Sequence, residues 1–174
     1  MGNLQEYLDK KQAERHLNKA QGYMELKLWD LAQQELRPVL DQPLREQSQV
    51  LAMFGETLRY QEKYADAVPY FEKAILIDSG NIELWLAFAW CEKRVGRIDL
   101  AIEAMENALK VDPESTILYY NMACYLALQN DEQGCIKYLS EAMKRVPECR
   151  AMAEKESDFD TIRQKETFRQ LLRS

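Results

Sequence analysis

Small side chains recur along the chain at a nearly constant interval, and larger apolar side chains keep the same interval. Two series of small residues and two series of apolar residues each advance by 35, 34 and 34 positions. The small residues are Ala20, Gly55, Ala89 and Ala123, then Ala32, Ala67, Ala101 and Cys135. The accompanying residues are Leu36, Phe71, Met105 and Leu139, then Val39, Ala74, Ala108 and Ala142. Four series that share one insertion, near residues 41–47, predict four copies of a single structural unit.

Within each unit the two small residues lie 12 positions apart, which predicts two antiparallel helices joined by a tight turn. Small side chains at the crossing let the two backbones approach, and bulky side chains one turn away fill the flanking space. Polar residues or glycine break the pattern between helices, and Pro113 ends one helix just before Ser115, which is placed to cap the next. The helices expected are 3–26, 29–41, 47–60, 64–77, 81–94, 98–110, 115–128, 132–145, 148–156 and 161–172.

The third unit, ELWLAFAWCEKRVGRIDLAIEAMENALKVDPES, resembles the tetratricopeptide repeat almost position by position. The matching residues are Trp85, Phe88, Ala89, Gly96, Ala101, Met105, Ala108 and Pro113. The second unit matches through Gly55, Tyr64, Ala67, Phe71 and Ala74, whereas the first departs at Lys19 and the fourth at Cys135. The resemblance covers about residues 13–149. It implies an all-α, right-handed α-α superhelix (solenoid) of four helix pairs plus C-terminal cap helices. The repeats would span 13–46, 48–81, 82–115 and 116–149, within a single domain of residues 1–174.

The last 25 residues, 150–174, resemble the closing segment of many bacterial repeat proteins. In that segment an Asp-Phe-x-x-Leu-Arg element precedes a Phe-x-x-Leu-Leu helix. The matching positions are Asp158, Phe159, Ile162, Arg163, Phe168, Leu171 and Leu172. A repeat stack exposes an apolar face at its end, so this segment is expected to act as a cap with one polar side. A separate docking helix is the alternative.

The resemblance also implies a binding surface, because the first helix of each pair lines the concave face in this family. The residues that this mapping assigns to the groove are Leu17, Met24, Arg59, Tyr60, Leu86, Trp90, Arg94, Ile117, Tyr120, Asn121 and Leu128. Aromatic residues and arginine dominate the energetics of protein interfaces, which favours a groove that binds a partner. The alternative is that Leu86, Trp90 and Tyr120 pack against a neighbouring helix, or are covered by the chain's own N-terminal segment or tail.

One subclass of partner is disfavoured by two of the groove positions. Co-chaperones of this family grip a C-terminal carboxylate through a lysine and an asparagine one helical turn apart on the first repeat. The corresponding residues in this chain are Leu17 and Gln21, and neither supplies an ammonium group.

Charge and hydropathy narrow the classes of partner further. The net charge is 23 − 29 = −6. Residues 1–142 carry −8 of it, and residues 143–174 carry +2. An acidic body repels phosphate backbones, so nucleic acid is not expected as a partner. No apolar run approaches the length that spans a membrane, and the N-terminus lacks the apolar core of a secretory signal, so a cytoplasmic location is expected.

Candidate chemistry is sparse. Cys91, Cys124, Cys135 and Cys149 show no close pairing of metal ligands, and they are expected to be reduced core residues. His16 is the only histidine, and the six glycines never cluster into a phosphate-binding loop. The sequence therefore predicts a protein that is not an enzyme and needs no cofactor or metal.

The favoured interpretation is a scaffold or adaptor that binds a protein or peptide segment of a partner in its concave groove. A secretion-type chaperone, which resembles this chain in size, acidity and repeat number, is one alternative. A self-assembling structural repeat protein, in which the groove accepts the tail of a neighbouring copy, is the other. The sequence is compatible with a homo-oligomer and does not identify the partner.

Overall fold

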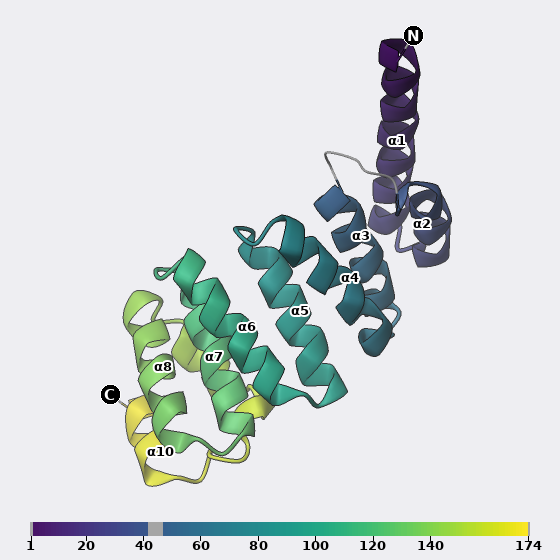
Figure 1. The fold of residues 1–174 in the computed structure, drawn as a ribbon. Helices are drawn as coiled ribbons and strands as arrows, with labels where there is room; N and C mark the ends of the chain where they lie inside the picture. The colour runs from purple at the N-terminus through teal and green to yellow at the C-terminus, as the bar shows by residue number, and fades with distance from the viewer. Residues whose placement is uncertain (1, 42–46, 174) are drawn as a thin grey trace. The chain divides into compact units, whose positions relative to one another are not determined.

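A computed structural model describes the backbone of residues 2–41 and 47–173, with side chains from residue 11 onward. Figure 1 shows a succession of helices, and the described ranges contain no β-strand. The α-helices are α1 (Gly2–Glu25), α2 (Trp29–Leu36), α3 (Gln47–Tyr60), α4 (Tyr64–Ile77), α5 (Ile82–Val95), α6 (Ile98–Val111), α7 (Thr116–Leu128), α8 (Glu132–Arg145), α9 (Cys149–Ala153) and α10 (Glu166–Arg173). Two 3₁₀ turns, η1 (Arg37–Val39) and η2 (Ser157–Phe159), complete the order. The position of the predicted insertion, 41–47, falls largely outside the described residues.

The chain forms two compact units, which are distinct from the four repeats: the first unit is residues 1–91 and the second unit is residues 92–174. Helix α5 runs through the division. In the first unit the predicted small residues Ala20, Ala32 and Ala67 are completely buried. A methyl group on Gly55 would lie only 3.0 Å from the ring of Phe71, so at this crossing of α3 and α4 even alanine would require the Phe71 ring to shift. The prediction that small residues mark helix crossings is therefore confirmed in this unit.

The second unit repeats the same packing. Ala101, Ala123 and Cys135 are completely buried, as are the bulky Met105 and Leu139 one turn after the small positions of α6 and α8. The cysteine thus takes the place of the small residue, as expected for a reduced core thiol.

The turn inside each helix pair has the same backbone geometry in all four repeats. One residue in each turn has a positive φ: Lys27 (57°), Glu62 (61°), Gly96 (90°) and Asn130 (61°). These residues are spaced by 35, 34 and 34 positions, as the helices are. In the second repeat, for example, the N–H groups of Glu62 and Lys63 donate to the carbonyls of Arg59 (3.0 Å) and Leu58 (2.9 Å). This left-handed cap satisfies the last carbonyls of the first helix and reverses the chain.

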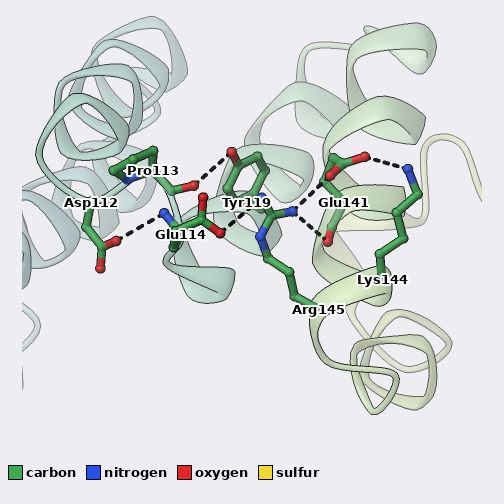
Figure 2. A network of polar contacts seen from close by, with 7 residues as sticks. All are labelled: Asp112, Pro113, Glu114, Tyr119, Glu141, Lys144 and Arg145. Atoms are coloured by element: carbon green, nitrogen blue, oxygen red, sulfur yellow. Dashed lines mark hydrogen bonds and ion pairs between the residues drawn. The ribbon is translucent and has the colours of Figure 1, made fainter.

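The loops between repeats are also held by a repeated contact. The indole N–H of Trp85 donates to the carbonyl of Ser79 at 2.9 Å, and 34 residues later the hydroxyl of Tyr119 donates to the carbonyl of Pro113 at 3.0 Å. Figure 2 shows the second of these contacts, with the guanidinium of Arg145 lying 4.2 Å from the centre of the Tyr119 ring. Arg145 also forms an ion pair with Glu114 at 3.8 Å, which ties the end of α8 to the loop before α7.

The predicted helix 29–41 is wrong at its end. The α-helix stops at Leu36 and tightens into the 3₁₀ turn η1. Pro38 explains the change, because proline has no N–H to continue the ladder and its ring collides with the carbonyl four residues earlier.

The predicted helix 161–172 is wrong at its start, since α10 begins only at Glu166. The segment before it is folded around the guanidinium of Arg163, which donates to three backbone carbonyls. The acceptors are Ala153 (3.4 Å), Glu154 (2.6 Å) and Glu156 (2.6 Å). These contacts satisfy carbonyls at and after the end of α9, while the segment that leads to α10 forms turns such as the one closed by the N–H of Lys165 and the carbonyl of Ile162 (2.9 Å).

Candidate functional site

Five side chains of the first unit form a continuous column of aromatic rings with one cation inside it. Trp29 and Tyr60 stack face to face, with ring centres 4.6 Å apart and planes inclined by only 4°. The guanidinium of Arg59 lies 4.4 Å from the centre of the Tyr60 ring and 5.1 Å from that of Trp90. Tyr64 meets Trp90 edge to face at 5.0 Å. We call these five residues the aromatic column.

Helix ends bring the column together. Trp29 opens α2, Tyr60 closes α3 and Tyr64 opens α4, so the left-handed turns place three rings near one edge of the helix pairs. Trp90 comes from α5, about one turn before the end of that helix. The column therefore depends on the turn geometry as well as on the helical repeat.

The charge inside the column is neutralised locally. Arg59 donates to the carboxylate of Glu56 through Nε (3.0 and 3.1 Å) and Nη2 (2.5 Å). Burial lowers the pKa of Arg59, but the hydrogen bonds and charge of Glu56 outweigh it, so the net pKa is raised above its ordinary value. The guanidinium is thus permanently charged and held by Glu56 in a fixed orientation between the rings.

The column is accessible from solvent. Tyr60 is 53% exposed, and Trp29, Tyr64 and Trp90 are half-buried. Leu28 and Leu31, on either side of Trp29 in the sequence, are exposed as well. Rigid aromatic rings beside exposed leucines are the kind of surface that soluble proteins keep for binding.

The other first-unit residues that the sequence assigned to the groove differ in their exposure to solvent. Met24 and Leu86 are half-buried and can contribute to a surface. Leu17 is only 8% exposed and belongs to the core of this unit. It lies with Ala13 and Ala20 on the buried stripe of α1, so it offers no surface to a partner in this structure.

In the second unit the chain's own tail covers part of α7. Phe159 is completely buried and meets the ring of Tyr120 edge to face at 5.9 Å. Asp158 forms an ion pair with Lys93, and the hydroxyl of Thr161 donates to the carbonyl of Ala127 at 2.7 Å. Residues 157–163, which we call the cap segment, thus cover Tyr120, one of the α7 residues that the sequence assigned to a partner.

Tyr120 is accordingly 7% exposed and lies beneath the cap segment. Burial raises the pKa of its phenol, and the hydroxyl has no hydrogen-bond partner among the residues that the structure describes. Among the remaining second-unit residues, Ile117 is 53% exposed, Arg94 is exposed, and Asn121 and Leu128 are half-buried. Asn121 donates to the carbonyl of Ile117 at 2.9 Å, which commits one of its amide hydrogens to its own helix.

Reactive chemistry is not assembled in the part of the chain with described side chains. No group of three His, Cys, Asp or Glu side chains there is placed to hold a metal ion. Nor does any helix over those residues combine the length and apolar character that crossing a bilayer would need. The four cysteines are buried thiols, and His16 is engaged with Glu35 at 2.8 Å.

Sequence reasoning missed two members of the column, Trp29 and Tyr64. Each is the first residue of the second helix of its repeat, whereas the repeat mapping takes its binding positions from the first helices. The signal that could have found them is their spacing. Trp29 and Tyr64 lie 35 positions apart, and each begins the second helix of its repeat.

Comparison with known proteins agrees with this architecture. A family model described as "Tetratricopeptide repeat" matches residues 48–81 and 82–115. The fold is similar to that of YrrB, described as a TPR protein with an unusual peptide-binding site: TM-score 0.74, 20% identity, 86% of this chain and 78% of YrrB covered. It is similar to MamA as well, with a TM-score of 0.81 at 13% identity over 94% of this chain and 88% of MamA. A tetratricopeptide repeat protein from Parabacteroides merdae ATCC 43184 gives 0.73 at 14% identity, over 86% of this chain and 56% of that protein. The expected all-α repeat fold is confirmed.

Proposed function

The chain is a tetratricopeptide-repeat protein, and from that premise we propose that it is an adaptor that holds a segment of a partner protein against the aromatic column. Proteins of this fold bind protein or peptide partners in general, and a peptide-binding site is described for the similar protein YrrB. The observation that carries the proposal is the column itself, an exposed and pre-ordered set of rings around Arg59.

Pre-ordering is the physical argument for binding at this surface. Each ring is already held by a stacking, edge or cation contact, so the column's own side chains lose little entropy when a partner packs against them. Arg59 is already paired with Glu56, so the partner need not provide a carboxylate for it. The column therefore favours a segment with one or two large apolar side chains that pack on Tyr60 and Trp90.

The test begins with selection of ligands from a random peptide library displayed on phage, using the purified full chain. Binding of a selected peptide is then measured by fluorescence anisotropy with the wild type, Trp90→Ala, Tyr60→Ala and the control Glu103→Ala. Loss of a true hot spot costs about 2 kcal/mol or more, which is about thirtyfold in Kd. We expect that loss for both aromatic variants and almost none for Glu103→Ala, which lies exposed on α6.

Circular dichroism of every variant accompanies the titrations. Tyr60→Ala is the more stringent variant, because half of the Tyr60 side chain faces solvent and its loss should leave the fold intact. If folded Trp90→Ala and folded Tyr60→Ala both bind the selected peptides as tightly as the wild type, the aromatic column is not the binding surface.

A further inference from the structure

A second surface of the first unit has a different chemistry from the aromatic column. An open hollow of about 540 Å³ lies over α3, between α2 and α4. Its floor is apolar and aromatic, formed by Leu58 and by Phe54, whose ring lies 4.6 Å from that of Tyr70. Its rim carries the cationic side chains of Arg37, Lys63 and Lys73.

The hollow and the column occupy different faces of α3. Phe54 and Leu58 are four residues apart and share the face that floors the hollow. Tyr60 follows Leu58 by two residues, which turns it about 200° around the helix axis. The two surfaces are therefore separate sites, and a change in one need not disturb the other.

The charge of the hollow is opposite to that of the chain. Three cations and the single carboxylate of Asp66 line it, so its formal charge is 3 − 1 = +2, whereas the whole chain carries −6. Arg37 is held over the floor, with its guanidinium 5.7 Å from the centre of the Phe54 ring. A positive surface with an aromatic floor on an acidic protein attracts a ligand that is both anionic and apolar.

The backbone of α4 adds a hydrogen-bond acceptor at the same place. Pro69 lies inside α4 and lines the hollow. Since proline has no N–H, the carbonyl of Ala65 lacks its helical donor, and Ala65 also lines the hollow. An N–H group of a ligand can donate a hydrogen bond to that carbonyl.

The spacing of the cations selects an elongated ligand. Lys63 precedes the first residue of α4, and Lys73 follows Lys63 by ten residues, or about 15 Å along the helix axis. A single phosphate cannot bridge that length, whereas an extended peptide covers it with about four or five residues. Three cations in an acidic chain are too few for a nucleic acid backbone.

We infer that this hollow binds an acidic, extended segment of a partner protein. Its carboxylates pair with Lys63, Lys73 and Arg37, an apolar side chain packs on Phe54 and Tyr70, and a backbone N–H donates to Ala65. The site is independent of the proposed function at the aromatic column. A chain that uses both surfaces can hold two segments, and so act as a bridge.

The experiment uses a fluorescein-labelled ten-residue peptide of alternating Asp and Leu, and the same peptide with Asn in place of Asp. Binding to the full chain is measured by anisotropy at several salt concentrations. The double variant Lys63→Glu, Lys73→Glu is compared with the control Lys110→Glu, Lys137→Glu, which changes the net charge equally but outside the first unit. We expect the acidic peptide to bind the wild type at least tenfold more tightly than the Asn peptide does. The affinity of the acidic peptide should fall at least tenfold in the Lys63→Glu, Lys73→Glu variant, which we call the hollow variant. In the control variant it should fall only by the smaller factor that the change in net charge causes.

Three outcomes would overturn the inference: equal binding of the acidic and neutral peptides, equal affinities of the two charge-reversed variants, or displacement of the peptide by millimolar inorganic phosphate alone. A peptide with Lys in place of Asp should bind the hollow variant more tightly than the wild type. That result would show that the variant is folded and that the sign of the charge in the hollow determines which peptide binds. Trp90→Ala should bind the acidic peptide as the wild type does. Failure at the hollow is therefore distinguishable from failure at the aromatic column.

Discussion

Replacing Phe159 by alanine should remove the contact that fixes the cap segment to α7. The Phe159 ring is completely buried, and its centre lies 5.9 Å from that of Tyr120 and 5.4 Å from that of Phe168. Truncation of a buried phenylalanine to alanine costs about 3–5 kcal/mol, through lost burial and the cavity left behind. Against a total stability of about 5–15 kcal/mol for a domain, that loss is large.

The magnitude converts into a melting temperature. For a chain of this size about 1 kcal/mol corresponds to roughly 2–4 °C, so Phe159→Ala should melt roughly 6–20 °C below the wild type. Far-ultraviolet circular dichroism records the transition, and near-ultraviolet dichroism reports on the packed tyrosine rings. The matched control is Met152→Ala in α9, because that side chain is 54% exposed and should shift the transition by no more than about 2 °C.

A second readout tests whether the cap segment itself opens. Burial first, and the negative charge of Asp158 next, raise the pKa of Cys124 well above its usual range, so its thiol is unreactive in the native protein. In Phe159→Ala the thiol should react with Ellman's reagent at pH 8 much faster than in the wild type. An unchanged melting temperature together with an unchanged rate of modification would mean that the tail is not a cap, and residues 150–174 would then be assigned to partner binding.

The remaining predictions concern the repeat and its turns. Gly55→Ala should lower the free energy of unfolding by about 1–3 kcal/mol, because the new methyl meets the buried ring of Phe71 at 3.0 Å. In Gly22→Ala the new methyl meets nothing within 4 Å, so this variant should raise the free energy of unfolding by about 0.5–1 kcal/mol. Glu62→Gly should stabilise the protein by roughly 1 kcal/mol in urea titrations, since glycine tolerates the φ of 61° that Glu62 adopts, and a less stable variant would contradict the cap geometry. Burial raises the pKa of Cys135 to about 12, so mass spectrometry should find it unlabelled by iodoacetamide at pH 8 until the protein is denatured.

The helices and their pairing follow from the sequence because they depend on local periodicity. Small residues 12 positions apart within a repeat fix where two helices cross, and both of those positions are buried in each of the four repeats. The ends of helices were less predictable where one residue outweighs the pattern. Pro38 ends α2 early through its missing N–H, and before α10 the chain forms turns in which the side chain of Arg163 binds carbonyls at and after the end of α9.

The candidate surfaces needed the tertiary structure. The repeat mapping assigns both Tyr60 and Tyr120 to the groove, on the first helices of their repeats, yet one is exposed in the aromatic column and the other lies under the cap segment. The mapping does not predict this difference in exposure, because what covers Tyr120 is Phe159, 39 positions away in the chain. The same holds for Trp29 and Tyr60, which stack across 31 positions. Helix periodicity is a property of neighbours along the chain, whereas exposure is decided by which distant segment folds back onto a helix face, and only the folded chain determines that.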